Sequence, residues 1–339
     1  MTFMLDEARQ APAAVARLLA RDGDAYRALG EALRHKPPQG IVTLARGSSD
    51  HAAQHLAYLA MARLGRLVTS LPPSLVTQYR AHLARPGQLA LGFSQSGRSP
   101  DLVQSLQHFS AAGATTVALV NDAGSPLARE SAWVLPLHAG EERSVAATKS
   151  FIAQLAAGMR LLASWSADAG LGTALDGLPE ALAQAAHSDW SAALAPLTAV
   201  DRLFVVGRGP GLAVAAEAAL KLEESCGMLA AALSGAELRH GPLALVGAGF
   251  PVLVFAPRGP AQAALLELAD ELRSRGARVL LAAPAQRPGV DLPLVAAPHP
   301  DLDAITAIQS FYPLAEALSR ARGHDPDRPP NLAKVTRTV

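Results

Sequence analysis

The sequence predicts an α/β protein that contains two copies of one fold. Short apolar runs alternate with longer amphipathic stretches, which is the pattern of a parallel sheet covered by helices on both faces. This order of segments occurs twice along the chain. Arg46, at the end of the first apolar run, has a counterpart 162 residues later in Arg208. Gly97 has a counterpart at the same spacing in Gly259. A constant spacing between equivalent residues indicates an internal duplication.

The first copy follows residues 1–37, which we expect to form a helical arm. Between its strands we expect helices such as residues 102–112, where the apolar side chains recur on one helical face. Its strands are predicted at four buried apolar runs, residues 41–45, 88–93, 115–120 and 132–137.

The second copy follows a helical linker rich in alanine, serine and aspartate, at about residues 164–197. Its strands are predicted at residues 203–206, 251–256 and 278–282. The expected organisation is an arm (1–37), a first domain (38–165), a second domain (195–325) and a tail (326–339) that carries Lys334.

The composition is that of a globular protein. Of 339 residues, 50% are hydrophobic and 17% are charged, which provides for a large core of small aliphatic side chains. The formal net charge of +1 is too small to attract nucleic acid or an anionic membrane, and we expect neither as a partner. The single cysteine, Cys226, excludes an internal disulfide and is typical of a reducing compartment. The first residues lack the apolar segment of a signal peptide, so we expect a cytoplasmic protein.

The strongest local motif is residues 92–101, GFSQSGRSPD, which lie between a predicted strand and a predicted helix. Backbone N–H groups at the start of a helix attract an anion, and Ser94, Ser96 and Ser99 add hydroxyl donors. The alternative is an ordinary helix start that Ser99 or Asp101 caps. Because three hydroxyls so close together exceed what a cap needs, we interpret the motif as a phosphate-binding loop.

Two further helix starts carry similar chemistry. Residues 45–51, ARGSSDH, follow the first predicted strand, and neighbouring parallel strands would bring this turn to the same crevice. Residues 140–150, GEERSVAATKS, combine two acids with basic and hydroxyl side chains. Each segment could equally be a capped, solvated helix start. We expect both to belong to the site.

The second copy carries candidate acid–base groups. Residues 221–226, KLEESC, lie on a predicted helix, and residues 235–242, GAELRHGP, follow it. A carboxylate and an imidazole are the usual proton-transfer pair near neutral pH, which makes the glutamates at 223 and 224 and His240 candidates. Spacing alone does not show that they meet, and glutamates on a helix are usually solvated.

Six segments together resemble the SIS (sugar isomerase) family, and within it the isomerase half of glucosamine-6-phosphate synthase. The resemblance extends over nearly the whole chain. It implies two tandem SIS domains, each a doubly wound, flavodoxin-like parallel β-sheet flanked by helices. The segments are residues 46–49 (RGSS), 94–97 (SQSG), 145–149 (VAATK), 219–222 (ALKL), 237–244 (ELRHGPLA) and 331–334 (NLAK).

The resemblance also implies roles for individual residues. Glu224 would move a proton between C1 and C2 of the sugar, His240 would open the sugar ring, and Lys221 would support the site. Lys334 would meet the open-chain carbonyl as a Schiff-base or positioning lysine. In this family the equivalent of His240 comes from the neighbouring subunit, which implies a homodimer with a shared active site. The phosphorylated sugar would be held by Ser48, Ser49, Ser94, Gln95, Ser96, Ser99, Val145 and Ala147.

Two departures from the synthase shape the expected function. Ala147 stands where the synthase has a hydroxyl, and Thr2 follows Met1 where a glutaminase half would need a nucleophilic cysteine. We therefore expect an enzyme without its own ammonia supply, similar to the SIS-type glucosamine-6-phosphate deaminases. It would convert glucosamine 6-phosphate and water into fructose 6-phosphate and ammonia. We expect no metal or other cofactor, because acid–base groups can handle an enolamine intermediate and the sequence has no Cys/His ligand cluster.

Alternative functions remain open on the sequence alone. The substrate could be galactosamine 6-phosphate, a fructosamine 6-phosphate or a simple aldose–ketose pair, because the side chains that distinguish these sugars are not apparent. A phosphosugar-sensing regulator is an alternative of another class. Such regulators carry a basic helix-turn-helix arm, which residues 1–37 do not resemble.

Overall fold

The computed structural model describes residues 1–334, so the predicted tail is described as far as Lys334 and its last five residues, 335–339, lie outside the described chain. The chain forms two compact units. The domain boundaries expected from the sequence stay a prediction. The N-terminal lobe consists of Ala13–Glu142, Lys149–Asp176 and, of the described tail, Ala333 and Lys334. The C-terminal lobe consists of Met1–Pro12, Arg143–Thr148 and Gly177–Leu332.

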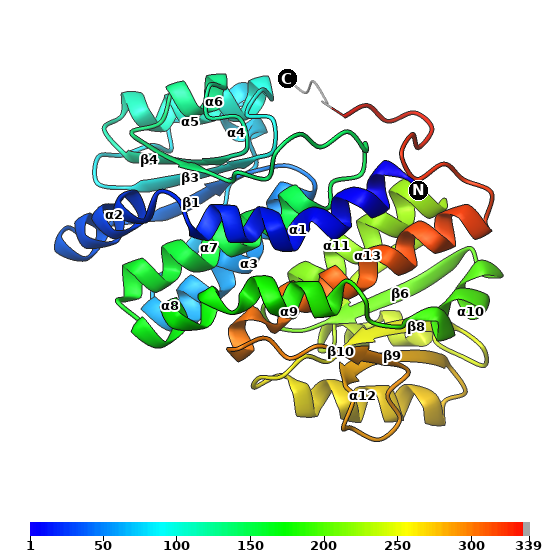
Figure 1. The fold of residues 1–339 in the computed structure, drawn as a ribbon. Helices are drawn as coiled ribbons and strands as arrows, with labels where there is room; N and C mark the ends of the chain where they lie inside the picture. The colour runs from blue at the N-terminus through cyan, green and yellow to red at the C-terminus, as the bar shows by residue number, and fades with distance from the viewer. Residues whose placement is uncertain (335–339) are drawn as a thin grey trace. The chain divides into compact units, whose positions relative to one another are not determined.

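The N-terminal lobe contains a parallel sheet with the strand order β2-β1-β3-β4-β5. The central strand β3 is buried at every position, as expected for a sheet that helices cover on both faces. Figure 1 shows α5 on one face of this sheet and α3 and α7 on the other. The strands are β1 (Ile41–Leu44), β2 (Val68–Ser70), β3 (Leu89–Ser94), β4 (Thr115–Val120) and β5 (Trp133–Pro136). The helices are α2 (Gly23–His35), α3 (Ser48–Leu64), α4 (Ser74–Thr77), α5 (Pro100–Ala111), α6 (Pro126–Arg129), α7 (Lys149–Ser166) and α8 (Ala169–Asp176), while α1 (Phe3–Leu19) begins in the other unit.

Helix α5 packs on the sheet through one apolar face. Leu102, Leu106 and Phe109 are spaced so that they share this face, and all three are buried. They belong to one hydrophobic cluster with Val42 of β1 and Val120 of β4. This packing anchors the start of α5 at the carboxyl end of β3.

The C-terminal lobe repeats the same topology. Its sheet has the order β10-β9-β8-β6-β7, so that β6 to β10 take the places of β1 to β5. This is the flavodoxin-like order, and it confirms the predicted pair of tandem α/β domains. The strands are β6 (Arg202–Gly207), β7 (Leu229–Ser234), β8 (Pro251–Phe255), β9 (Arg278–Pro284) and β10 (Leu292–Leu294). The helices are α9 (Leu178–Ala185), α10 (Leu194–Thr198), α11 (Gly211–Cys226), α12 (Gln262–Ser274) and α13 (Asp303–Ala321), with short 3₁₀ helices η1 (Ser191–Ala193), η2 (Glu237–His240), η3 (Pro242–Leu245) and η4 (Pro300–Leu302).

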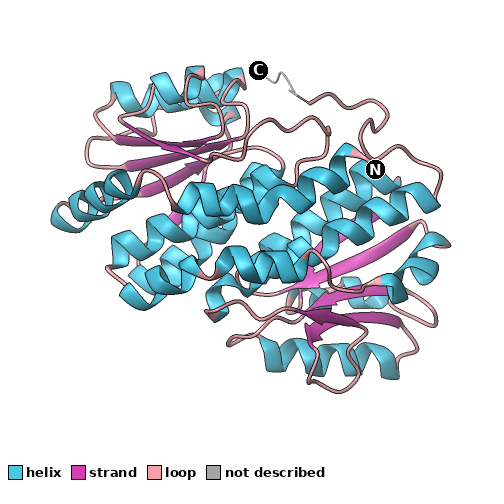
Figure 2. Cartoon of the chain, in the orientation of Figure 1, coloured by secondary structure: helices cyan, strands magenta, loops and turns pink. Residues whose placement is uncertain are grey.

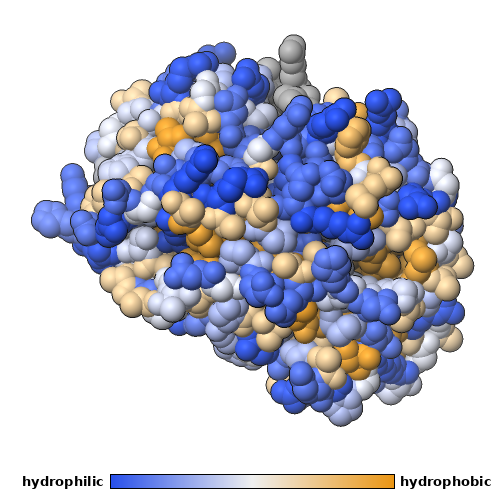
Figure 3. Space-filling view, viewed as in Figure 1, coloured by the Kyte–Doolittle hydropathy of each residue, from blue (hydrophilic) through white to orange (hydrophobic). Residues whose placement is uncertain are grey.

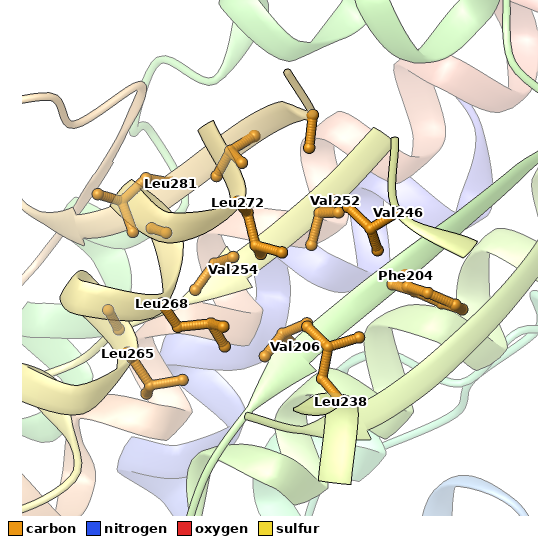
Figure 4. Packing of buried hydrophobic residues seen from close by; sticks show 14 of the residues in the cluster. Phe204, Val206, Leu238, Val246, Val252, Val254, Leu265, Leu268, Leu272 and Leu281 are labelled. Atoms are coloured by element: carbon orange, nitrogen blue, oxygen red, sulfur yellow. The ribbon is translucent and has the colours of Figure 1, made fainter. Parts of the chain in front are cut away.

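One hydrophobic cluster of the C-terminal lobe lies between its sheet and α12. Figure 4 shows Val206 of β6, Val254 of β8 and Leu268 of α12 directed toward one another. These side chains are fully buried members of one cluster. Small and branched aliphatic residues supply most of this core, as the composition predicted.

A strand lies at every predicted apolar run, and the described residues add three unpredicted strands, β2, β7 and β10. All three lie at the edges of the two sheets, whose strands Figure 2 draws in magenta. Strand β2 is partly or fully exposed at each position. An edge strand needs no continuous apolar run, because one side of it faces solvent.

No helix within residues 1–334 is long and apolar enough to cross a membrane. On the face shown in Figure 3, hydrophobic residues form separate patches among hydrophilic ones. Large hydrophobic side chains that are exposed include Leu67 in the N-terminal lobe and Leu229 in the C-terminal lobe.

Candidate active site

The predicted phosphate loop connects β3 to α5 in the N-terminal lobe. Ser94 ends β3, and its buried hydroxyl oxygen accepts a hydrogen bond from the backbone N–H of Gly97 at 3.0 Å. Gly97 has a φ of +64°, and a Cβ on it would lie 2.1 Å from the hydroxyl oxygen of Ser125. The chain can make this turn only with glycine. The turn places residues 95–99 at the carboxyl end of the central strand.

The hydroxyl of Ser99 does not cap α5. Ser99 occupies the N-cap position before Pro100, but its side chain makes no capping hydrogen bond. The other predicted cap, Asp101, accepts the N–H of Leu102 at 2.9 Å, and its second oxygen binds Arg46 at 2.9 Å. Helix capping therefore does not account for the serine at position 99.

The turn after β1 lies at the same edge of the sheet. Strands β1 and β3 are hydrogen-bonded parallel neighbours, so the turns that follow them adjoin. Helix α3 begins at Ser48, after Gly47 with a φ of +53°. The hydroxyl oxygen of Ser49 accepts a hydrogen bond from Nε2 of Gln154 in α7 at 2.9 Å. The structure thus brings two hydroxyl-bearing turns to one edge of the N-terminal sheet.

Two arginines beside these turns are already paired. Arg46 binds Asp101 at 2.9 Å, and Arg98 binds Asp122 at 2.8 Å. The two arginine side chains are 48% and 58% exposed. Because a carboxylate balances each guanidinium group, N–H and hydroxyl donors are the main means by which this edge can bind an anion.

Lys334 also belongs to the N-terminal lobe. Its Nζ lies 2.8 Å from Oε2 of Glu142, whose side chain is fully buried. The same carboxylate accepts the N–H and the hydroxyl of Ser150, in the first turn of α7, at 3.1 and 2.6 Å. Glu142 is therefore not the solvated helix-start acid that the sequence also allowed; only its neighbour Glu141 is exposed.

In the C-terminal lobe, α11 places Lys221 between two glutamates. Its ammonium forms ion pairs with Glu224 and with Glu217, the latter at 3.4 Å. Lys221 and Glu217 are fully buried, and the hydroxyl of Tyr312 donates to Glu217 at 3.4 Å. Burial alone would lower the pKa of Lys221, but the charges of the two glutamates outweigh it and raise that pKa above its ordinary value. Lys221 is therefore a fixed cation that holds Glu224.

Glu224 lines a pocket of about 390 Å³. Its side chain is 22% exposed, so a ligand can reach the carboxylate. Burial and the charge of Glu224 raise the pKa of Glu223, which lines the same pocket. The remaining lining residues are Leu220, Gly227, His324, Pro330 and Leu332.

The pocket contains a histidine that the sequence did not indicate. His240 is an exposed residue at the end of η2 and does not line the pocket, whereas His324 does. His324 contacts the end of α11, since a Cβ on Gly227 would lie 2.9 Å from its Nε2. No motif surrounds His324 in the sequence, so only the three-dimensional fold brings it to the predicted acid.

Val145 and Ala147 lie on the segment Arg143–Thr148, which belongs to the C-terminal lobe. The N–H of Val145 donates to the carbonyl of Asp327 at 3.2 Å. The carboxylate of Glu7, in α1, accepts the N–H of the preceding residue at 3.1 Å. The arm of the chain therefore helps to fix this segment, a contact that no local sequence pattern predicts.

Each lobe thus holds its own set of predicted residues. The N-terminal set is Ser48, Ser49, Ser94, Gln95, Ser96, Ser99 and Lys334, and the C-terminal set is Lys221, Glu224, His240, Val145 and Ala147. Within residues 1–334, no group of three or more His, Cys, Asp or Glu residues is placed to hold a metal ion.

Comparison with known families defines the class of protein. The SIS domain family matches residues 36–164 and 197–283, which contain β1 to β5 and most of β6 to β9. This chain belongs to the SIS domain family, as its motifs predicted.

Similar proteins within this family include enzymes that are named for sugar-phosphate substrates. The isomerizing glutamine–fructose-6-phosphate aminotransferase of Methanothermobacter thermautotrophicus is 33% identical over 98% of this chain and 57% of its own length. The chain therefore spans little more than half of that relative. A solved protein of Silicibacter pomeroyi, assigned as a phosphosugar isomerase, is 43% identical with a TM-score of 0.91, over 96% of this chain and 100% of that one. Glucosamine-6-phosphate deaminase of Thermotoga maritima shares the fold, with a TM-score of 0.79 at 22% identity over 99% of this chain and 100% of its own.

Proposed function

We propose that this chain is a phosphosugar isomerase that acts on an amino sugar, converting glucosamine 6-phosphate and water into fructose 6-phosphate and ammonia. The observation that carries the proposal is the cluster on α11, where buried Lys221 holds the carboxylate of Glu224 at a pocket. A reaction that moves a proton between adjacent carbons needs such a fixed, accessible carboxylate. A protein that only senses a sugar has no need for a buried cation behind an acid.

The turn at residues 94–99 supports a phosphorylated substrate. It combines a helix start with hydroxyls, and the serine at its end is not used as a cap. This turn, together with Ser48 and Ser49, would bind the phosphate of the substrate, and Glu224 would move the substrate's proton.

The proposed mechanism needs no oxidant. His240 opens the pyranose ring by moving a proton from the C1 hydroxyl to the ring oxygen. Glu224 then removes the C2 proton of the aldehyde form, the C–H electrons form the C1–C2 double bond, and the C1 oxygen takes a proton to give an enolamine. Glu224 returns its proton to C1, and the double bond moves to C2 and nitrogen as a ketimine. Water adds to C2 and ammonia leaves, which gives fructose 6-phosphate.

The two lysines have different tasks in this proposal. Lys221 keeps Glu224 in place and stays charged, because its pKa is raised. Lys334 meets the open-chain carbonyl of the sugar. Because relatives of this chain include isomerizing aminotransferases, the test must follow ammonia itself and not the isomerisation alone.

We test the proposal with purified protein and glucosamine 6-phosphate, measuring ammonia and fructose 6-phosphate together. Galactosamine 6-phosphate and fructoselysine 6-phosphate are run in parallel. Glu224→Gln should lower kcat by roughly 10²–10⁴-fold and leave substrate binding nearly unchanged, as expected for loss of a general acid–base. Glu267→Gln, an exposed acid on α12, is the control. Absence of ammonia from every amino sugar, or full activity of Glu224→Gln, would refute the proposal.

We further propose a homodimer in which the neighbouring subunit supplies His240. The exposure of His240, away from the pocket that Glu224 lines, supports this arrangement. Mixing the two inactive variants Glu224→Gln and His240→Asn and allowing their subunits to exchange should restore about a quarter of wild-type activity, because half of the dimers gain one complete site. No recovery after exchange would show that each subunit uses its own histidine.

A further inference from the structure

The carboxylate of Glu142 joins parts of the N-terminal lobe that are far apart in the sequence. Glu142 follows β5, Ser150 lies in the first turn of α7, and Lys334 is the last described residue. The Glu142 side chain has no exposed surface. A buried carboxylate is stable only where a cation and hydrogen bonds compensate its lost hydration, and this one has both.

Ser150 fixes the orientation of the carboxylate. Oε1 of Glu142 accepts the Ser150 N–H at 3.1 Å, and Oε2 accepts its hydroxyl at 2.6 Å. These bonds are made to the positive end of an 18-residue helix, which also favours a negative charge. Lys334, by contrast, lies outside any helix or strand. Glu142 is therefore the fixed member of the pair, and the lysine is the member that is held.

We propose that Glu142 is a positioning residue, which docks Lys334 at the head of α7 so that its side chain stands in a defined place before the sugar binds. The inference rests on the proposed function, in which Lys334 meets the substrate carbonyl. Glu142 need not touch the sugar, because it acts through the lysine. A catalytic group that is held in advance loses less freedom when the reaction begins.

Replacing Glu142 disrupts the Glu142–Lys334 ion pair with the least disturbance to the buried surroundings. In Glu142→Gln the lysine loses its partner but remains hydrated, since its side chain is 23% exposed. Lys334→Ala would instead remove a cation from beside a buried carboxylate. The matched control is Glu141→Gln, the exposed neighbour. Ser150→Ala is a second variant, which loosens the carboxylate but keeps its charge.

The first measurement is independent of turnover. Lysines are acetylated with an N-hydroxysuccinimide ester, and the rate at Lys334 is compared by mass spectrometry with that at exposed Lys36. Glu142→Gln should raise the relative rate at Lys334 by about tenfold, since an amine released from its charge-assisted hydrogen bond is more accessible to the reagent. Ser150→Ala should give a smaller increase and Glu141→Gln none. Equal rates in the wild type and Glu142→Gln would overturn the proposal.

The second measurement tests whether Glu142 acts through the lysine. Glu142→Gln should lower kcat/KM by about 10- to 100-fold, a typical loss when a supporting residue is removed. Added to Lys334→Ala it should cause no further loss, because the group that it positions is already absent. A full additional loss would overturn the proposal. A wild-type protein without turnover would instead refute the proposed function, and the acetylation rates would still decide the docking.

Discussion

The turn after the central strand occurs twice in this molecule, once after β3 and once after β8. The two turns differ in their hydrogen-bond donors and in the partners of these donors. After β3, the turn has a glycine with a φ of +64° and three serines, and Ser99 stands at the start of α5 without capping it. After β8, the equivalent residues 256–261 contain no hydroxyl. This second turn has Arg258 in place of a serine.

The second turn binds a carboxylate of its own chain. Asp303, the first residue of α13, accepts the backbone N–H of Arg258 at 3.2 Å and its Nε at 2.7 Å. The other carboxylate oxygen accepts Nη2 of Arg258 at 2.7 Å and the N–H of Ala297 at 2.9 Å. In the second turn, Asp303 thus satisfies donors internally, whereas the proposed function assigns donors of the first turn to a ligand. Under the proposed function, both copies keep the same architecture and only the first copy binds a phosphate.

Gly97→Ala should break the first turn most severely. The new Cβ would lie 2.1 Å from Oγ of Ser125 and 2.5 Å from its Cβ. We expect a loss of roughly 2–4 kcal/mol in the free energy of unfolding, from overpacking and the left-handed backbone. Binding of fructose 6-phosphate, measured by calorimetry, should weaken by at least about 100-fold, or ~2.7 kcal/mol.

Gly259→Ala is the matched change in the second turn. No atom would lie within 4 Å of its Cβ, although its φ of +131° also favours glycine. It should reduce stability and leave binding of fructose 6-phosphate unchanged. Equal loss of binding in both variants would show that the two turns do not differ in the way described.

Asp303→Ala should open the second turn. Arg258 is 36% exposed and loses both its ion pair and several hydrogen bonds, so we expect a loss of about 1–3 kcal/mol in stability by denaturant unfolding. Added inorganic phosphate should raise the melting temperature of this variant more than that of the wild type, because the anion can replace the lost carboxylate. If phosphate stabilises the variant and the wild type equally, the second turn does not bind an anion in place of the Asp303 carboxylate.

Ser99→Ala separates the two interpretations of the first turn. If the serine binds phosphate, affinity for fructose 6-phosphate should fall about tenfold, or ~1.4 kcal/mol, and stability should change by less than about 0.5 kcal/mol. If the serine were an ordinary cap, stability should instead fall by about 1 kcal/mol with no change in affinity. Calorimetric titration and chemical denaturation on the same sample distinguish these outcomes.

The smallest expected effect is on the rate at which the thiol of Cys226 reacts with a reagent. It is buried in the C-terminal lobe, and burial raises the pKa of its thiol to about 12. At pH 8 the native protein should therefore react with a thiol reagent far more slowly than the unfolded chain. Asp303→Ala should accelerate the reaction, whereas Gly97→Ala should do so less, since it lies in the other lobe. Rapid labelling of the folded wild type would contradict the burial.

The sequence predicted those features that depend on local patterns. Apolar runs identified the central strands, and the constant spacing between equivalent residues identified the duplication. Three of the four edge strands were not predicted. Half of the residues in β7 are alanines, which have low strand propensity, and only one residue of this strand is fully buried. The Gly97 turn could be predicted because glycine allows a tight turn at a strand–helix junction and hydroxyls there can donate hydrogen bonds to an anion.

The contacts that complete the site could not be predicted in this way. Glu142 and Lys334, or Glu224 and His324, are brought together by tertiary folding across long stretches of sequence. One glutamate of the pair at 141 and 142 is exposed and the other is buried, although their local sequence is the same. Only the packing around α7 separates their roles.

The central claim is that the turn after β3 binds the phosphate and the turn after β8 does not. Hydrogen–deuterium exchange with and without saturating fructose 6-phosphate measures both turns in one experiment. Amides at residues 95–99 should become protected by the sugar, while those of Arg258 and Gly259 should exchange at an unchanged rate. Protection of the second turn alone, or no protection of the first, would contradict the claim.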